Sequence, residues 1–288
     1  MGKLERRNWP YIYFFLLPSV IIFIMFYLVP ILTVIITSFT RWNGYNIPEF
    51  TGLNNYIKLF QTKTFLISLK NLLLWSLIAA TAHVGFGVLV AFLLYRQPIG
   101  WKFVRAVFMI PNVISVAAWA MIYKFIFHND FGLLNNILRI FIPNLSIDWF
   151  YQSPAAFWAI TFTWLFYAVV VTLIVLGDLM AIPTELHEAA FIDGATNWQV
   201  TMNINLPLCR NSISTSIILS MTARVAMYET IILTSRGGPG DDTTNLPLIL
   251  VRAIQDMNYG YANAVAMIMI LIGITMLVGI NALFEERD

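Results

Sequence analysis

The chain has 288 residues, of which 59% are hydrophobic and only 11% are charged, and its formal net charge is +2. A soluble domain carries about 25% charged residues because its surface faces water, so this composition excludes an ordinary soluble protein and predicts extensive lipid contact. The sequence contains no long Lys/Arg run that would indicate a nucleic-acid partner. A lone cysteine, Cys209, excludes an internal disulfide and a multi-cysteine metal site.

Six continuous apolar segments are long enough to cross a bilayer as helices, which takes roughly 20 residues each. They are residues 11–38, 68–95, 104–127, 155–182, 213–235 and 262–284. The strands of a membrane barrel alternate apolar and polar residues over roughly ten positions, whereas these runs are apolar throughout. We therefore predict an all-α polytopic membrane protein with six transmembrane helices, forming a single transmembrane domain over residues 1–288.

The first apolar segment follows Lys3, Arg6 and Arg7, as the core of a signal peptide would. It is much longer than the roughly 7–15 apolar residues of such a core, and no small-residue cleavage site follows it, so we expect a retained span. Lys and Arg are denser in the connections that face inward if the amino terminus is cytoplasmic, which predicts that both termini lie in the cytoplasm. Short amphipathic segments at 54–60 and 133–142 are expected along the outer membrane face.

The cytoplasmic connection between the predicted fourth and fifth spans, residues 183–207, is the most informative stretch. Pro183 and Glu185 suit the first turn of a helix, and Gly194 is able to end that helix in the left-handed conformation. A second short helix fits residues 196–203, before Pro207. The result is a bihelical elbow with small residues that permit close approach of a partner, although an interfacial helix without a partner fits the same pattern.

Glu188-Ala189-Ala190, Gly194 and Ile204-x-Leu206-Pro207 stand in this connection at fixed spacing. The stretch resembles the EAA signature of the membrane subunits of bacterial ABC importers. In that family it forms a coupling helix held in a cleft of the ATP-hydrolysing subunit. The resemblance assigns this coupling role to Glu188, Ala189, Ala190, Asp193, Gly194, Ile204, Leu206 and Pro207.

Shorter segments over nearly the whole chain resemble the maltose-type sugar branch of these permeases. They are Phe14-x3-Pro18, residues 50–56, Gly132 to Asn135, Gly237-Gly238-Pro239 with Thr243-Thr244, and Tyr259 to Ala262. Ser235-Arg236 departs from the glycine that the branch often has beside its Gly-Gly-Pro turn. The resemblance implies sugar import by alternating access across the bacterial cytoplasmic membrane. The implied partners are ABC ATPase subunits, a second homologous permease in a heterodimer, and an extracytoplasmic solute-binding protein.

The chain has no Walker A loop, because its single Gly-Lys pair, Gly2-Lys3, follows no glycine-rich loop. We therefore expect no enzymatic activity and no cofactor in this chain, with ATP and Mg²⁺ bound by the partner subunits. Asp193 has no second carboxylate at catalytic spacing. Asp241-Asp242 fits a solvated turn better than a metal site.

Ionisable residues within a span cost about 2.5–3.5 kcal/mol on insertion scales, so they tend to face a cavity or a partner. Arg224 and Glu229 lie deep in the fifth segment and would be roughly 140° apart on a continuous helix. Lys124 and Asp178 lie near span ends, where their side chains reach the interface. The predicted substrate-pathway residues are Arg224, Tyr228, Glu229, Ser220, Asn263 and His83. The alternative is an interhelical hydrogen bond for His83 and a structural role between subunits for the residues of the fifth segment.

Two rival functions remain open. An ABC permease for a non-sugar solute would share the EAA signature. An ion-coupled secondary transporter would show broken-helix repeats and buried acidic relays, which the sequence does not indicate. A membrane enzyme is disfavoured because no metal-ligand spacing or nucleophile set is present. The identity of the sugar is not indicated.

Overall fold

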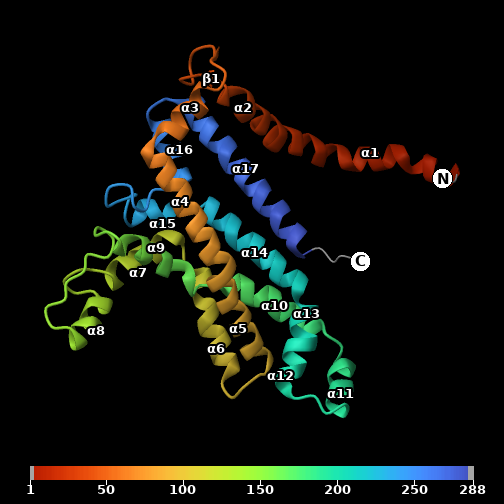
Figure 1. Ribbon diagram of the computed structural model, residues 1–288. Helices are drawn as coiled ribbons and strands as arrows, with labels where there is room; N and C mark the ends of the chain where they lie inside the picture. Colours follow the sequence, from red (N-terminus) through yellow and green to blue (C-terminus); the bar gives the residue numbers. More distant parts are fainter. Residues whose placement is uncertain (1–2, 285–288) are drawn as a thin grey trace. The chain divides into compact units, whose positions relative to one another are not determined.

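The computed structural model describes residues 3–284, with side chains from residue 12 onward, and its regular secondary structure is almost entirely helical (Figure 1). The described chain forms two compact units. One comprises Met1–Gln61 with Leu250–Ile268, and the other comprises Thr62–Ile249 with Met269–Asp288. The side chains of Lys3, Arg6 and Arg7, which enter the orientation argument, lie outside the described residues.

Four helices are long and apolar enough to cross a membrane in the described part of the chain. They are Ile12–Ser38, Lys63–Tyr95, Ala155–Ala181 and Tyr259–Phe284. A bent pair, Trp101–Val113 with Val116–Ile126, makes a fifth if it counts as one span. The all-α, multi-span prediction is confirmed, and the ranges agree with the predicted first, second, fourth and sixth segments to within a few residues.

The first unit contains the amino-terminal helix and a short hairpin. Its elements are α1 (Lys3–Phe23), the π-helix η1 (Ile24–Leu28), α2 (Val29–Ser38), β1 (Thr40–Arg41), β2 (Glu49–Phe50) and α3 (Asn54–Gln61), with parts of α16 (Leu246–Gln255) and α17 (Tyr259–Phe284). The strands are antiparallel, with Thr40 opposite Phe50 and Arg41 opposite Glu49. The helix α3 confirms the predicted amphipathic segment at 54–60.

Close backbone approach joins the two sequence-distant parts of this unit. A Cβ on Gly260 would collide with the carbonyl oxygen of Thr40, so the start of α17 packs directly on β1. The Gly260 N–H donates to the carbonyl of Trp42 at 3.2 Å. The buried Asn55 amide donates to the carbonyls of Ser38 and Thr40 at 2.9 Å each. Two motifs that carry the family resemblance therefore have a structural role here.

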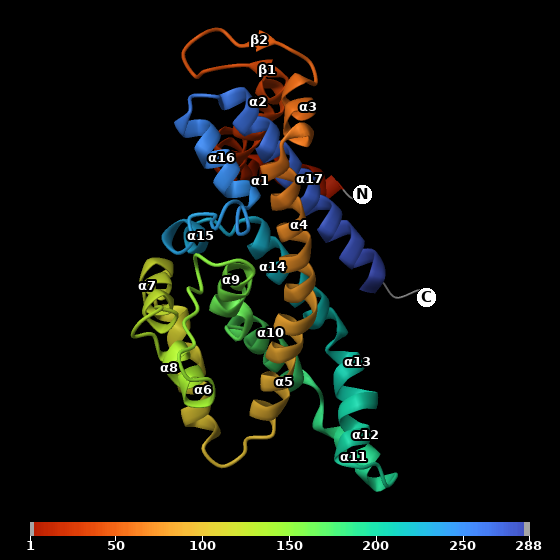
Figure 2. The ribbon, with the colours of Figure 1, turned by 60° about the vertical axis from the view of Figure 1, so that its left-hand side comes forward.

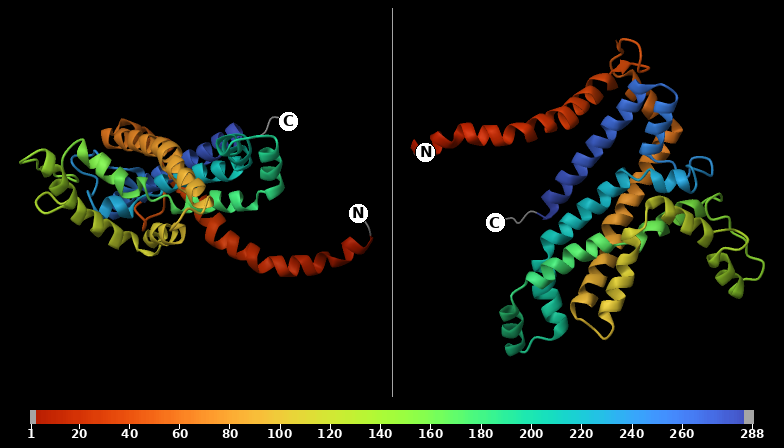
Figure 3. Two further views of the ribbon diagram at one scale, coloured as in Figure 1. Left: turned by 90° about the horizontal axis from the view of Figure 1, so that it is seen from below. Right: turned by 180° about the vertical axis from the view of Figure 1, so that it is seen from behind.

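The second unit carries the remaining helices, which Figures 2 and 3 show from other sides. They are α4 (Lys63–Ile78), the π-helix η2 (Ala79–His83), α5 (Val84–Tyr95), α6 (Trp101–Met109), the 3₁₀-helix η3 (Ile110–Val113), α7 (Val116–Ile126), α8 (Leu133–Phe141), α9 (Ala155–Leu165), α10 (Val169–Ala181), α11 (Thr184–Ile192), α12 (Asn197–Val200), the π-helix η4 (Thr201–Asn205), α13 (Leu206–Leu208), α14 (Arg210–Val225) and α15 (Glu229–Leu233). The helix α8 confirms the second predicted amphipathic segment.

Helices α5 and α10 pack closely at Gly87. A Cβ at this position would lie 2.6 Å from a methyl group of Val171. The Thr172 hydroxyl donates to the Gly87 carbonyl at 3.0 Å. Small residues allow such contact between apolar helices, where packing and interhelical hydrogen bonds replace the hydrophobic effect as the driving force.

The predicted span at 104–127 is not one continuous helix, because the chain bends by 108° between Val113 and Val116. Pro111 lacks a backbone donor and lies in the first turn of η3. Ser115 then starts a new helix, since its hydroxyl accepts from the Ala118 N–H at 3.3 Å. This proline and this cap together explain the change of direction.

Candidate functional site

Residues 183–207 form an elbow of two helical arms at one end of the second unit (Figures 1 and 2). The first arm, α11, ends at Gly194, whose φ is +82°. The Gly194 N–H donates to the Phe191 carbonyl at 3.1 Å, and the Ala195 N–H donates to the Ala190 carbonyl at 2.9 Å. These two bonds form a Schellman motif. The predicted left-handed end of the first helix is therefore confirmed.

The second arm begins with a capping box that was not predicted. The Thr196 hydroxyl accepts from the Gln199 N–H, and the Gln199 side chain accepts from the Thr196 N–H. The predicted end at residue 203 is wrong, because the helix continues through Pro207 into α13. A proline ring clashes with the carbonyl four residues earlier, and the wider π turn of η4, directly before α13, relieves that clash.

A side-chain bond ties the two arms of the elbow together. His187 Nε2 and Asn205 Oδ1 lie 2.7 Å apart, joining α11 to η4. An Arg96 guanidinium nitrogen at the end of α5 donates weakly to the Thr201 hydroxyl at 3.4 Å. These groups line a cavity of about 170 Å³. The sequence interpretation assigned no role to His187, because a single histidine without a fixed-spacing partner gives no signal.

The first arm presents apolar side chains outward. No residue of α11 is buried in the described structure, and Ile192 is 86% exposed. Leu186, Ala189 and Ile192 recur every three residues and so share one face. Trp198 on the second arm is 66% exposed. Of the predicted coupling residues, Ala190, Ile204 and Leu206 are half-buried, and the exposed ones are Glu188, Ala189, Asp193, Gly194 and Pro207.

A second cluster surrounds Trp164 in the interior of the same unit. The guanidinium carbon of Arg224 lies 4.1 Å from the centroid of the Trp164 ring, within the range of a cation–π contact. His83 approaches the same ring edge-on, with centroids 5.9 Å apart. The structure thus brings together two of the predicted substrate-pathway residues, Arg224 and His83, with Trp164, which was not predicted.

Two helix breaks flank this cluster, at residues 166–168 and 226–228. Backbone groups freed by a break need other partners in a membrane. Trp119 Nε1 donates to the Thr163 carbonyl at 2.7 Å, and His83 Nδ1 lies 3.0 Å from the Leu165 carbonyl. The Asn245 side chain donates to the Met227 carbonyl. Each break is therefore stabilised by a side chain from another segment.

These breaks correct two predictions. The expected continuous helix over 213–235 is wrong, because α14 ends at Val225 and α15 begins at Glu229. The roughly 140° separation of Arg224 and Glu229 therefore does not apply. Broken helices are thus present, although the two breaks are not shown to form the repeats expected of a secondary transporter. No Asp or Glu is buried between residues 12 and 284, however, so the acidic relay of an ion-coupled transporter is not found there.

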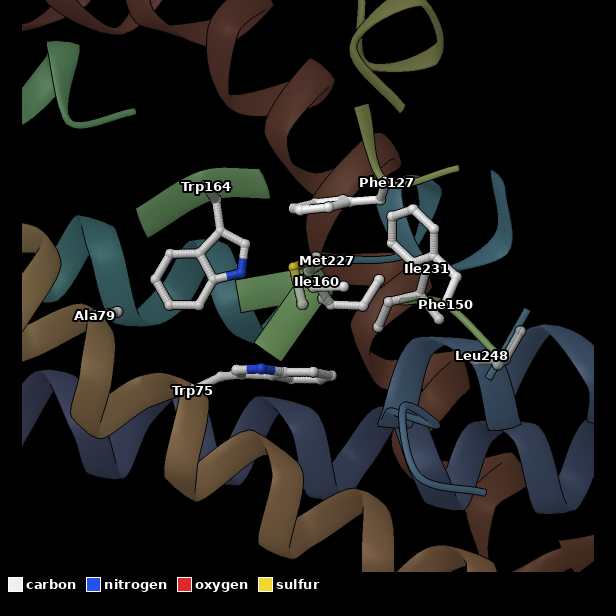
Figure 4. Packing of buried hydrophobic residues seen from close by; sticks show 10 residues of the cluster. Trp75, Ala79, Phe127, Phe150, Ile160, Trp164, Met227, Ile231 and Leu248 are labelled. Atoms are coloured by element: carbon white, nitrogen blue, oxygen red, sulfur yellow. The ribbon is translucent and has the colours of Figure 1, made fainter. Parts of the chain in front are cut away.

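Four buried polar atoms have no hydrogen-bond partner in the described part of the chain. They are Ser76 Oγ, Trp164 Nε1, Ser216 Oγ and Arg224 Nε. Each such group is costly in an apolar interior unless a ligand, water or neighbouring chain completes it. Figure 4 shows the indole nitrogen of Trp164 on the side of the ring nearest Met227. Three of the four belong to α9 and α14, and two of these, Trp164 and Arg224, lie beside the helix breaks.

The remaining predicted pathway residues are more scattered. Ser220 is buried on α14, one turn before Arg224. Tyr228 packs against the aromatic core that includes Trp75 and Trp164, and Glu229 is exposed. Asn263 belongs to the first unit, where its amide donates to the Thr37 hydroxyl at 2.6 Å.

Hydrogen bonds to α4 hold the acidic loop before α16, which the sequence suggested to be a solvated turn. Asp241 accepts from the Thr64 hydroxyl at 2.6 Å, and the Asn71 amide donates to the carbonyls of Asp242 and Thr244 at 2.9 and 3.0 Å. No group of three or more potential metal ligands is found among the described residues. Asp241 therefore anchors this loop to α4.

The fold and these features define a multi-span helical membrane protein with an exposed elbow and a polar interior cluster. Residues 83–287 match the family described as "Binding-protein-dependent transport system inner membrane component", so the chain belongs to that family. Membership confirms the resemblance to importer permeases that the EAA segment indicates.

The comparisons also place the chain among particular relatives. It is 32% identical to the multiple sugar-binding transport system permease protein MsmF of Streptococcus mutans, over 97% of this chain and 96% of that protein. It is 28% identical to the trehalose/maltose transport system permease protein MalF of Thermococcus litoralis, over 93% and 91% of the two chains. A chain of a bacterial alginate ABC transporter, crystallised with a pentasaccharide-bound periplasmic protein, superimposes with a TM-score of 0.83 at 22% identity, over 98% of this chain and 96% of that one.

Proposed function

We propose that this chain is a permease subunit of an ATP-driven importer that moves a sugar or oligosaccharide across the bacterial cytoplasmic membrane. The relatives named for multiple sugars and for trehalose and maltose cover nearly the whole chain, which supports a carbohydrate substrate. The exposed elbow is the observation that carries the mechanism, because its first arm ends in a left-handed glycine and no residue of this arm is buried in the described chain.

In this mechanism the elbow docks into a groove of an ATPase subunit. The face with Leu186, Ala189 and Ile192 supplies apolar contact, and the small Ala189 lets the partner backbone approach closely. The His187–Asn205 bond keeps α11 and η4 at a fixed angle. Movement of the ATPase therefore passes through η4 and α13 into α14. ATP and Mg²⁺ belong to the partner, and this chain requires no cofactor.

The proposed assembly has six spans in each of two homologous, different permeases, with both termini in the cytoplasm. The α14–α15 region supplies the fifth span, with its break inside the protein. The first span supports a partner chain, because only 6% of its most apolar window is buried within this chain. A solute-binding protein delivers the sugar to the outer connections. In these connections, a polar cavity of about 640 Å³ lies beside the hairpin and is lined by Trp42, Asn46 and Asp256, among other residues.

The proposed substrate path runs along the polar face of α14. Sugars need polar groups for their hydroxyls and aromatic faces for their apolar ring surfaces. Ser220, Arg224 and Trp164 provide both within one region. The breaks beside them let the surrounding helices change angle, as alternating access requires.

The decisive experiment is reconstitution of the purified complex, with its ATPases, second permease and binding protein, into liposomes. Sugar uptake should require ATP and the binding protein, and it should be unaffected when ion gradients are collapsed. Uptake of an amino acid, polyamine or phosphate in place of sugar would support the non-sugar alternative. Uptake driven by an ion gradient without ATP would contradict the mechanism.

A further inference from the structure

We propose that the imported sugar is acidic and that Arg224 holds its carboxylate during passage. This inference rests on the proposed sugar-import function and adds the charge class of the substrate. The relatives named above do not decide the charge, since their printed names include both trehalose/maltose and alginate. The charge class is inferred instead from buried polar groups on α9 and α14 that have no hydrogen-bond partner in the described chain.

The charge of Arg224 is not balanced within the described part of the chain. No carboxylate between residues 12 and 284 pairs with its guanidinium, and Glu229, beyond the helix break, is exposed. The contacts of the guanidinium are the Trp164 ring face and the Met227 sulfur, which lies 3.9 Å from Nη1. Arg224 is half-buried, and its Nε is fully buried. A charge held in such a site without a counter-charge is unfavourable, so the site favours an anion.

The geometry of the guanidinium suits a carboxylate. Stacking on Trp164 uses a ring face, whereas hydrogen bonds lie in the plane of the five N–H donors. Nε is buried and has no acceptor. Arg binds planar carboxylates through two parallel bonds from one edge of this fork. The guanidinium carbon lies over the Trp164 ring, and Nε has no acceptor in the described chain, so an incoming carboxylate would complete the bonding of this fork.

The surrounding donors suit the rest of a sugar. Ser216, Ser220 and Arg224 are spaced four residues apart on α14 and so lie on one face. Ser216 Oγ and Trp164 Nε1 are buried without partners. A hydroxyl both donates and accepts, whereas an indole N–H only donates. Hydroxyl and carboxylate oxygens of one acidic sugar would satisfy all of these groups.

A matched pair of substrates tests this proposal in the reconstituted complex. The pair is an oligogalacturonide and the same oligosaccharide with its carboxylates reduced to alcohols. Wild type should import the acidic sugar, and Arg224→Gln should lower that uptake about tenfold to a hundredfold, because charged hydrogen bonds are lost. Arg224→Lys should retain part of the activity. Co-purification of both permeases should stay unchanged, which shows that the variant complex still assembles.

Three outcomes would overturn the inference while leaving the proposed function intact. The first is import of only the neutral sugar by wild type. The second is an equal loss of acidic and neutral uptake in Arg224→Gln. The third is dissociation of the second permease from Arg224→Gln, which would make Arg224 an ion-pair partner of that chain. Import of neither sugar, with ATP hydrolysis insensitive to the binding protein, would instead contradict the proposed function.

Discussion

The guanidinium of Arg224 rests 4.1 Å from the ring centroid of Trp164, between two helices that are both broken nearby. This pairing holds a cation in the interior of the helical unit without a carboxylate from the described chain. His83 packs against the same tryptophan and binds the Leu165 carbonyl at the end of α9. Polar side chains of the interior thus gather around helix ends, where backbone carbonyls lack helical hydrogen-bond donors.

Gly194 should tolerate only residues that adopt the left-handed conformation. A Cβ at this position would meet no atom within 4 Å, so steric crowding does not select glycine here. The positive φ of the backbone alone selects residues that adopt the left-handed conformation. Gly194→Val should therefore lose ATP-dependent uptake, because a β-branched residue at positive φ is strained. Gly194→Asn should retain much of it. Uptake and co-purification with the ATPase check this, and full activity of Gly194→Val would argue against the elbow's role.

Breaking the His187–Asn205 bond should weaken coupling and leave membrane insertion intact. A neutral hydrogen bond contributes about 0.5–1.5 kcal/mol, so the uptake per ATP hydrolysed should fall about twofold to tenfold in His187→Ala. Asn205→Ala should have a similar effect, since both variants remove the same contact. The double variant should be no worse than either single one. Additive losses would show that the two residues act separately.

Gly260→Ala should destabilise the first unit. The added methyl collides with the Thr40 carbonyl, which belongs to backbone and has little freedom to move. Overpacking of this kind costs about 1–3 kcal/mol. Gly279→Ala is the matched control on the same helix, since its Cβ would meet nothing within 4 Å. Thermal denaturation of the detergent-solubilised complex should show a lower midpoint for Gly260→Ala only.

Cys209 should resist thiol reagents in the folded protein. Burial raises the pKa of its thiol to about 11, and the nearby Asp178 acts in the same direction. The thiolate is the reactive form, so little of it is present at neutral pH. Maleimide labelling at pH 7 should proceed only after denaturation. Labelling of the folded wild type at the rate of a free thiol would contradict this.

Because Cys209 should not react in the folded protein, a cysteine introduced into the elbow would be the reactive thiol of the chain. A single introduced cysteine, Ala189→Cys, lies on an exposed position and should label readily in the isolated chain. In the assembled complex it should be protected by the ATPase and should crosslink to it. Equal labelling in both states would show that this face has no such partner.

Hydropathy alone was sufficient for the helical, multi-span class, because apolar runs of this length have few other stable solutions in lipid. The end of α11 at Gly194 was also predictable, since glycine adopts positive φ without a steric cost. The EAA spacing indicated the family, which the comparisons confirm. The bend after Pro111 and the π turn before Pro207 were missed, although both have a proline as their local signal.

Local sequence does not predict the breaks at 166–168 and 226–228, because no proline or glycine stands at either. They exist because distant side chains, those of His83, Trp119 and Asn245, take the place of helical hydrogen-bond donors. The placement of Arg224 over Trp164 has the same origin, since only the tertiary arrangement of α14 and α9 brings those residues together. The sequence by itself determined which segments are helical and apolar and where the elbow lies. Tertiary structure alone decided where those helices stop and which polar groups face one another, because those bonds join residues far apart in the chain.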